Sequence, residues 1–157
     1  MKEIILKTSI YKCKFSELSK SEKLLVKECK KIIKSAYAPY SSFYVGASVL
    51  LENGEIISGT NQENASYPSG LCAERVAVFY ANAKFPKTPI KTILITAFSN
   101  DKFVKYPISP CGSCRQVLLE SEMRFKKDIK VILFAKEEII FFKNVKGLLP
   151  LFFDKIP

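Results

Sequence analysis

"CAERVAVFYANAKFPKTPIKTILITAFSNDKFVKYPISPCGSCRQVLLESEM", residues 72–123, decides the fold class. Apolar residues at helical spacing predict helices over 72–84 and about 111–123, and the apolar run at 91–98 predicts a buried strand between them. Alternation of helices and strands through the middle of a chain is typical of α/β proteins, in which helices cover the faces of a sheet. We therefore expect an α/β fold in which a cysteine stands at the start of each of these two helices.

The flanking segments supply the rest of the predicted sheet. "FYVGASVLL" (43–51) and "EIISGTN" (55–61) flank the turn "ENGE", which is a hairpin signal. "KVILFA" (130–135) and "EIIFFK" (138–143) predict two more strands, and residues 16–37 predict an amphipathic first helix with serines available as N-caps. Together these elements predict a mixed sheet of five strands sandwiched by helices.

Length and composition fit one globular domain. The chain has 157 residues and is 48% hydrophobic, so we expect a single domain over residues 1–157. No apolar run approaches the roughly 20 residues that span a bilayer, and the lysine-interrupted start lacks a cleavage signal, so we expect a soluble, unexported protein without a membrane segment. The five cysteines then favour thiols and metal sites in a reducing compartment, the cytoplasm, over disulfides.

The sequence contains no histidine, and this narrows its chemistry. The usual general base, every Ser-His or Cys-His nucleophile pair and every histidine metal ligand are excluded. Any transition-metal site must therefore use cysteine and carboxylate. The net charge of +10 comes mainly from scattered lysines, since only three of the 25 basic residues are arginine, and we expect a solvated surface rather than a nucleic-acid site.

Three cysteines have the spacing of a metal centre. Cys111 and Cys114 are three residues apart, so both sulfurs can reach one ion across a helical turn, and Cys72 can supply a third ligand. Their places at predicted helix starts favour the thiolate form. Two alternatives stay open: a closed site with Cys13 or Cys29 as the fourth ligand, and a redox pair at Cys111 and Cys114.

A glutamate two residues after Cys72 favours an open, catalytic site. Three ligands leave a fourth position for water, and zinc can lower the pKa of that water toward neutrality. Glu74 could then move a proton between water and substrate, although a first-turn glutamate is also favoured by the helix dipole alone. Three thiolates on one divalent ion leave a net charge of about −1. Arg75 and Arg115 could offset it by hydrogen bonds to the sulfurs, the alternative being that both are surface residues.

These motifs resemble a known enzyme family. "C-A-E" followed by "P-C-G-S-C" is similar to the three-cysteine form of the zinc deaminase signature. "YAPYSSFYVGASVL", "NQENASYPSGLCAER" and "SPCGSCRQVL" look like the small cytidine deaminases of pyrimidine salvage. The resemblance runs from about residue 31 to residue 119, and it is weak over the first 15 or so residues and after Arg124.

The resemblance implies one Zn²⁺ per chain, with Cys72, Cys111 and Cys114 as ligands and Glu74 as the proton shuttle. It implies hydrolytic deamination of cytidine and 2′-deoxycytidine to uridine and 2′-deoxyuridine with release of ammonia, with zinc-bound water as the nucleophile. The implied substrate contacts are Phe43 against the pyrimidine ring, Asn61 and Glu63 at the ribose 3′-hydroxyl, and the backbone of Ala73 and Ser109 at the base edge.

The resemblance also implies a homotetramer. "LLPLFF" looks like the ending of the family's chains, in which a nearby phenylalanine reaches the site of a neighbouring subunit. Phe153 fits that role better than Phe152, and a core-packing aromatic is the alternative. Tyr67 is the other residue that we expect at a subunit contact.

Three other functions remain as alternatives. A deaminase of cytosine in single-stranded nucleic acid would use the positive charge, but Glu63 would repel a phosphodiester at the 3′ position. A deaminase of a cytosine-nucleoside antibiotic such as blasticidin S shares the fold, although the full "NQEN" block favours an ordinary ribose. A structural zinc module that binds nucleic acid would need a fourth protein ligand and no Glu74. We therefore expect a nucleoside as the partner, and neither nucleic acid nor a membrane.

Overall fold

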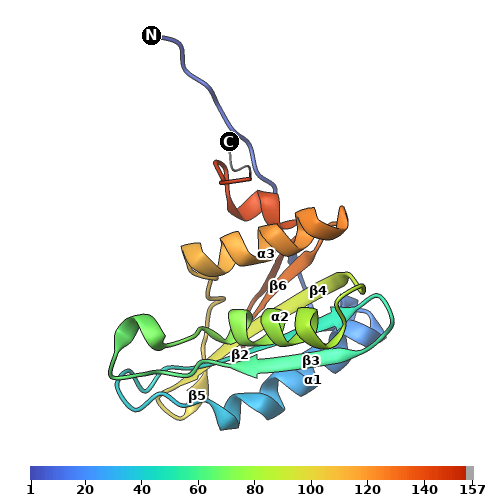
Figure 1. Ribbon diagram of the computed structural model, residues 1–157. Helices are drawn as coiled ribbons and strands as arrows, with labels where there is room; N and C mark the ends of the chain where they lie inside the picture. Colours follow the sequence, from blue (N-terminus) through green and yellow to red (C-terminus); the bar gives the residue numbers. More distant parts are fainter. Residues whose placement is uncertain (155–157) are drawn as a thin grey trace.

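A mixed β-sheet runs through the middle of the molecule, and helices cover both of its faces (Figure 1). The computed structural model describes residues 1–154, so the last three residues of the predicted domain lie outside the described part of the chain. The elements follow in chain order: β1 (Tyr11–Cys13), η1 (Phe15–Glu17), α1 (Lys20–Ile32), η2 (Ile33–Ser35), β2 (Tyr44–Leu51), β3 (Ile56–Thr60), η3 (Tyr67–Ser69), α2 (Ala73–Lys84), β4 (Ile90–Ser99), β5 (Lys102–Phe103), α3 (Gly112–Phe125), β6 (Lys130–Phe134), β7 (Ile139–Phe142) and η4 (Val145–Leu148).

Within residues 1–154 the sheet has seven strands in the order β1-β7-β6-β4-β2-β3, with β5 paired to β4. β4 and β6 run parallel and are joined through α3, while the other described pairs are antiparallel. The predicted α/β class and mixed sheet are confirmed. The predicted count of five strands is corrected to seven, because β1 and β5 are only three and two residues long and no side-chain periodicity marks them.

The central strand β4 shows how the two faces are built. Ile93 and Ile95 lie in the apolar layer beneath α2 and α3, whereas Leu94 lies in the layer beneath α1. Successive side chains of a strand point to opposite faces, and here both faces are covered, so nearly every position is apolar. The buried strand predicted for residues 91–98 is confirmed and extends one residue further at each end.

The helices α2 and α3 follow the predicted positions closely, whereas α1 covers only Lys20–Ile32 of the predicted residues 16–37 and is flanked by the short turns η1 and η2. α2 and α3 each begin one residue later than predicted, because Cys72 and Cys111 are their N-cap residues. A serine caps α1, since Ser19 Oγ accepts a hydrogen bond from the Glu22 amide at 3.2 Å and the Glu22 carboxylate accepts one from the Ser19 amide at 2.8 Å. This reciprocal capping box stabilises the first turn of the helix. No helix within residues 1–154 is long and apolar enough to cross a bilayer.

Two glycines let the helices approach the sheet closely, one on each face. A Cβ atom on Gly59 in β3 would lie 2.6 Å from the Ala77 amide nitrogen and 2.9 Å from the Ala73 carbonyl oxygen of α2. A Cβ atom on Gly46 in β2 would lie 2.9 Å from the Cys29 carbonyl oxygen of α1. Any larger residue would push the helix backbone away, so Gly59 fixes how deep the start of α2 sits.

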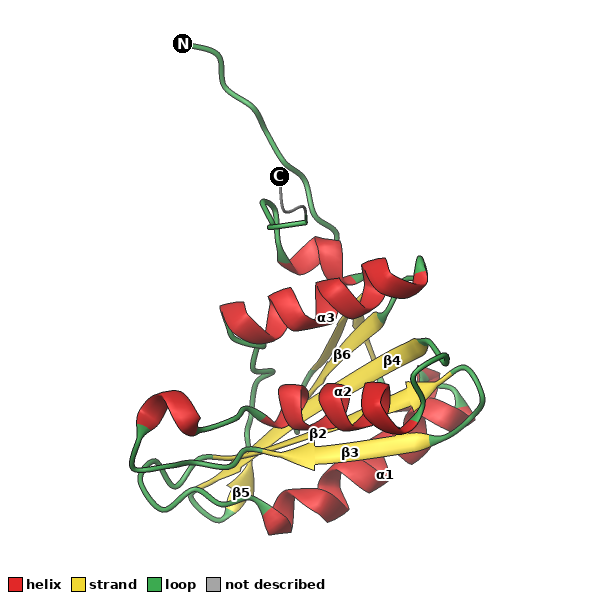
Figure 2. Cartoon of the chain, in the orientation of Figure 1, coloured by secondary structure: helices red, strands yellow, loops and turns green. Residues whose placement is uncertain are grey.

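The two helices on one face begin on the same side of the sheet (Figure 2). Cys72 directly precedes α2 and Cys111 directly precedes α3, so the topology brings both cysteine motifs to one place. The first ten residues are exposed and form no helix or strand, and they run beside the η4 region (Figure 1). Thr8 Oγ1 donates a hydrogen bond to the Gly147 carbonyl there at 2.8 Å.

Candidate metal centre

Three sulfurs meet where α2 and α3 begin. The Cys72 and Cys111 Sγ atoms are 3.8 Å apart, the Cys111 and Cys114 Sγ atoms are 3.4 Å apart, and all three lie within 4.8 Å of one another. Zinc–sulfur bonds of about 2.3 Å in a tetrahedral site place sulfurs about 3.8 Å apart. The three cysteines therefore fit one zinc ion, and they form the only such donor group among residues 1–154.

The other two cysteines lie in the α1 layer on the opposite face of the sheet. Cys29 is fully buried in α1 and its Sγ donates to the Leu94 carbonyl at 3.8 Å, while Cys13 in β1 packs at the edge of the same layer. Burial raises the pKa of the Cys29 thiol to about 12, so it stays neutral. Neither belongs to the donor group, and a closed four-cysteine site has no fourth ligand among the described residues.

The surroundings of the three-cysteine cluster favour a thiolate at Cys72. Cys72 and Cys111 occupy the N-cap positions of their helices and Cys114 the first turn of α3, where amide groups and the helix dipole stabilise negative charge. Hydrogen bonds from Cys114 and Cys111, together with the Arg75 guanidinium, lower the pKa of Cys72 to about 5 in spite of its partial burial. The hydrogen bond with Cys72 and burial raise the pKa of Cys114.

A buried carboxylate stands beside the cluster. Glu74 is the second residue of α2 and its side chain is only 5% exposed. Burial raises the pKa of Glu74, and the nearby negative charge of Cys72 raises it further. A carboxyl group with a raised pKa takes up and releases protons closer to neutral pH than an exposed glutamate, and a proton carrier needs this property.

The two arginines that follow cysteine motifs have different surroundings. Arg75 lines a hollow together with Cys72, its Nη2 donates to the Gly70 carbonyl at 3.5 Å, and its buried Nε has no partner in the described part of the chain. Arg115 donates instead to the carbonyls of Pro110 at 2.8 Å and Leu148 at 3.0 Å. Arg115 thus ties the start of α3 to η4, and no hydrogen bond from it to a sulfur occurs among the described contacts.

A hollow of about 290 Å³ joins the metal centre to the segment that follows β3. Its lining includes Cys72, Arg75, Asn61, Glu63 and Tyr67. The predicted substrate residues Asn61 and Glu63 and the predicted subunit-contact residue Tyr67 are therefore neighbours of a predicted metal ligand. Three more predicted substrate residues lie around this region without lining the hollow, and they are half-buried Phe43 before β2, buried Ala73 at the start of α2, and exposed Ser109 before Pro110.

Asn61 and Glu63 hold the loop that precedes β2. Asn61 Oδ1 accepts from the Val45 amide at 2.8 Å, and its Nδ2 donates to the Phe43 carbonyl at 2.9 Å. Glu63 Oε2 accepts from the Tyr40 amide at 2.9 Å, and Glu63 Oε1 accepts from the Ser41 hydroxyl. Ser41 was not among the residues predicted from the sequence, because no spacing rule links a serine to a carboxylate 22 positions away.

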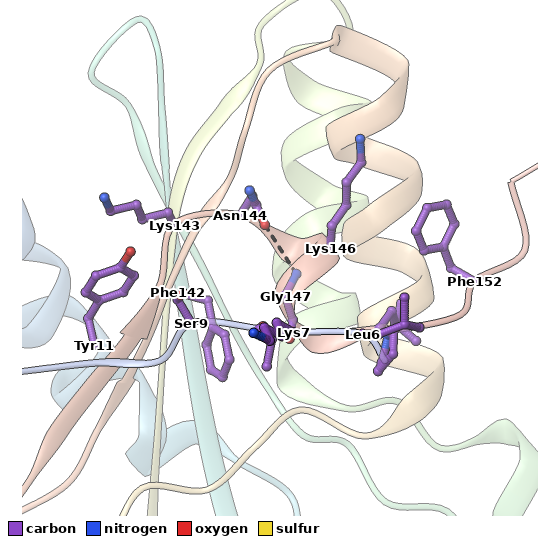
Figure 3. A pocket seen from close by; sticks show the side chains of 13 residues that line it. Leu6, Lys7, Ser9, Tyr11, Phe142, Lys143, Asn144, Lys146, Gly147 and Phe152 are labelled. Atoms are coloured by element: carbon purple, nitrogen blue, oxygen red, sulfur yellow. Dashed lines mark hydrogen bonds between the residues drawn. The ribbon is translucent and has the colours of Figure 1, made fainter. Parts of the chain in front are cut away.

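Another cavity, of about 460 Å³, lies apart from the metal centre. It is formed by the exposed N-terminal segment and the η4 region, and it shares no lining residue with the cysteine cluster (Figure 3). The side chains of Lys143 and Lys146 point in different directions there, so their ammonium groups do not converge on one ligand position (Figure 3).

The C-terminal segment reaches back to α3. The Phe153 carbonyl accepts a hydrogen bond from Gln116 Nε2 at 2.7 Å, and the Phe153 side chain is 66% exposed. Phe152 is 37% exposed and lines the cavity beside the N-terminal segment. The exposed ring of Phe153 is not packed into the core, and its contact with a second subunit stays a prediction.

Comparison with known proteins identifies the family. The family model for the cytidine and deoxycytidylate deaminase zinc-binding region matches residues 19–128. The chain belongs to the cytidine and deoxycytidylate deaminase family. The resemblance seen in the sequence motifs is thereby confirmed, and the matched region contains all three clustered cysteines and Glu74.

Curated and solved members of this deaminase family resemble the chain in sequence and fold. A cytidine deaminase of Halalkalibacterium halodurans is 42% identical over 97 residues, which are 62% of this chain and 69% of that relative. A probable cytidine deaminase of Dictyostelium discoideum is 35% identical over 120 residues, 76% of this chain and 75% of the relative. The crystal structure of a cytidine deaminase from Burkholderia pseudomallei matches with a TM-score of 0.70 at 35% identity, covering 83% of this chain and 98% of that one.

Membership in the deaminase family makes the chain a zinc-dependent hydrolase. The predicted cofactor, zinc, is confirmed by the matched zinc-binding region together with the cluster of Cys72, Cys111 and Cys114, which fits one ion per chain.

Proposed function

We propose that the chain hydrolyses cytidine and 2′-deoxycytidine to uridine and 2′-deoxyuridine with release of ammonia, in pyrimidine salvage. One observation carries the proposal: the buried carboxylate of Glu74 stands two residues from Cys72 in a three-thiolate centre. Three ligands leave a fourth position open, as in catalytic zinc sites, whereas structural sites are closed by four. The related proteins named above as cytidine deaminases support the choice of substrate.

Zinc held by Cys72, Cys111 and Cys114 supplies a Lewis acid that lowers the pKa of a bound water and so provides the nucleophile. Glu74 takes a proton from this water and delivers it to N3 of the cytosine ring, which makes C4 electrophilic. The water oxygen bonds to C4, and Glu74 takes the second proton from that oxygen and passes it to the amino group. The C4–N bond then breaks, so that ammonia departs and a carbonyl remains at C4. The burial of Glu74 excludes bulk water and keeps its pKa raised, which suits both transfers.

The remaining residues of the proposed site hold the nucleoside. We assign Phe43 to the face of the pyrimidine, the backbone of Ala73 and Ser109 to the base edge, and Asn61 and Glu63 to the ribose 3′-hydroxyl. The hollow that connects Cys72 with Asn61 and Glu63 supports this arrangement, in which the base lies near the metal ligand and the sugar lies at Asn61 and Glu63.

The ionised state of Glu63 favours a free nucleoside over a polynucleotide. Hydrogen bonds from the Ser41 hydroxyl and the Tyr40 amide lower the pKa of Glu63, so the carboxylate is charged at neutral pH. A 3′-phosphodiester would place a second negative charge beside it, and like charges at this distance repel.

We further propose a cytoplasmic homotetramer. A reducing compartment keeps the three thiolates from forming disulfides. Large aromatic side chains are exposed on the helix layer and around the site, with Tyr67 82%, Tyr80 55% and Phe79 48% exposed. Phe79 and Tyr80 are neighbours in α2, and exposed aromatic side chains close together are typical of a surface that packs against another subunit. The molecular mass of the zinc-loaded protein in solution tests this assembly.

The Glu74→Gln variant tests the proposed reaction. Loss of the proton carrier should lower cytidine turnover by about 100-fold to 10,000-fold, while zinc content stays at one ion per chain. Deamination is followed by the ultraviolet change from cytidine to uridine, and zinc is measured by elemental analysis on the same sample. Unchanged turnover with zinc retained would exclude Glu74 as the proton carrier, whereas a wild type that holds zinc but does not deaminate cytidine would favour a structural zinc module.

A further inference from the structure

Two segments that flank the β2–β3 hairpin are joined by backbone hydrogen bonds. The Tyr37 amide donates to the Asn61 carbonyl at 3.0 Å, and the Glu63 amide donates to the Tyr37 carbonyl at 2.9 Å. These bonds bring the loop of residues 38–43 over the Glu63 side chain. The loop ends in Phe43, so its conformation decides where that ring stands.

One hydroxyl in this loop contacts both proposed substrate-binding elements. Ser41 Oγ donates to Glu63 Oε1 and accepts from the Phe43 amide at 3.1 Å. The other carboxylate oxygen, Glu63 Oε2, accepts from the Tyr40 amide at 2.9 Å and the Ser41 amide at 3.3 Å. An ionised carboxylate offers about four acceptor positions. Three are filled from this loop, so about one is left for a ligand.

We propose that Ser41 is a positioning residue of the sugar subsite, whose hydroxyl holds the Glu63 carboxylate so that its remaining acceptor position meets the 3′-hydroxyl of the nucleoside. This inference rests on the proposed deaminase function. A free glutamate side chain on the surface samples many rotamers, and the hydroxyl removes that freedom before the substrate arrives.

The hydroxyl also acts on the charge of its partner. The Ser41 hydrogen bond is the largest contribution that lowers the pKa of Glu63. An ionised acceptor makes a shorter and stronger hydrogen bond to a ribose hydroxyl than a neutral one does. The same contact thus orients the acceptor and keeps it charged.

Phe43 does not depend on Ser41 alone. The Phe43 carbonyl accepts from Asn61 Nδ2 at 2.9 Å, and the next residues enter β2, where Tyr44 pairs with Phe98 of β4. Removing the Ser41 hydroxyl should therefore weaken binding of the sugar more than it shifts the Phe43 ring. This difference separates a positioning role from a merely structural one.

The test compares two substrates on the zinc-loaded enzyme: cytidine and 3′-deoxycytidine, which lacks the hydroxyl in question. We expect the wild type to prefer cytidine by at least about tenfold in kcat/KM. Ser41→Ala should lower kcat/KM for cytidine by about tenfold, mainly through KM, and leave that for 3′-deoxycytidine within about twofold. Ser41→Thr, which keeps the hydroxyl, should restore the preference.

The neighbouring Ser42→Ala variant is the matched control, since no side-chain hydrogen bond of Ser42 occurs among the described contacts, and it should keep the wild-type preference. If Ser41→Ala leaves the preference for cytidine unchanged, or lowers kcat/KM equally for both substrates, the positioning role is wrong while the proposed function stands. A wild type that deaminates both substrates equally well would overturn the proposed 3′-hydroxyl contact of Glu63, and the role of Ser41 with it. Zinc content and the unfolding temperature of each variant establish that the fold is intact.

Discussion

Cysteines on the two faces of the sheet have opposite chemical states. On the α1 face, Cys29 is fully buried among aliphatic side chains, and burial raises its pKa to about 12. On the face of α2 and α3, hydrogen bonds from the other two cluster cysteines lower the pKa of Cys72 to about 5. The first is a neutral packing residue and the second a thiolate ready for a cation.

The difference arises from the neighbours of each sulfur rather than from depth alone. Cys114 is as fully buried as Cys29, yet it belongs to the metal cluster. Cys114 lies in the first turn of α3 beside the Cys72 and Cys111 sulfurs, whereas Cys29 lies near the end of α1, where the helix dipole disfavours negative charge. Burial raises the pKa of Cys114 as it does that of Cys29, but among the described residues only the cluster offers a site where a cation can replace the proton.

Cysteine substitutions on the two faces should have the largest and most unequal effects. Cys72→Ser should abolish zinc binding and reduce deamination to background, because two ligands cannot hold the ion in a catalytic geometry. A Cys13→Ser and Cys29→Ala double variant should keep one zinc per chain and most of its activity, with a loss of stability from the cavity in the α1 layer. Elemental analysis and a cytidine assay measure both outcomes. Loss of zinc from the double variant would contradict the three-ligand centre.

Substitutions of the two close-packed glycines, Gly59 and Gly46, should lower stability by similar amounts but differ in their effect on zinc binding. Gly59→Ala pushes against Ala73 and Ala77 of α2, so it should cost about 1 to 3 kcal/mol of unfolding free energy and weaken zinc binding by displacing Cys72. Gly46→Ala pushes against Cys29 of α1 and should cost a similar free energy while zinc binding stays intact. Denaturant unfolding and a competition titration with a chelator measure the two quantities. Equal zinc affinity in both variants would show that the depth of α2 does not govern the centre.

The smallest effect concerns a charged pair on the α1 face. Burial acts to raise the pKa of Glu22, but hydrogen bonds from Lys130, at 2.6 Å, and from Ser19 hold it below its ordinary value of 4.5. A lowered carboxyl pKa contributes stability above the unfolded-state value, and this contribution is lost as the pH falls through the folded-state pKa. Glu22→Gln should therefore cost about 1 kcal/mol at pH 7 and progressively less in acid, with no change in zinc content. A stability difference that stays constant from pH 7 to pH 3 would exclude this ionic contribution.

Local sequence signals were enough to place the main elements. The capping serine, the glycine-containing turn between β2 and β3, and the apolar run of β4 each act over a few residues, so they are visible without tertiary information. The short strands β1 and β5 were missed because only their backbone pairing with β7 and β4 makes them strands.

The sequence by itself determined which side chains could bind zinc, since it has no histidine and sets Cys111 and Cys114 one helical turn apart. Spacing alone could not join Cys72, 39 positions before Cys111, to this pair, and the tertiary structure decided that it lies beside them whereas Cys13 and Cys29 do not. It also decided that Ser41 holds Glu63 and that Arg115 bonds to Leu148 instead of a sulfur. Spacing along a helix is a local property that the chain encodes directly. Contacts between distant segments depend on how the sheet orders its strands and on how closely each helix packs against it.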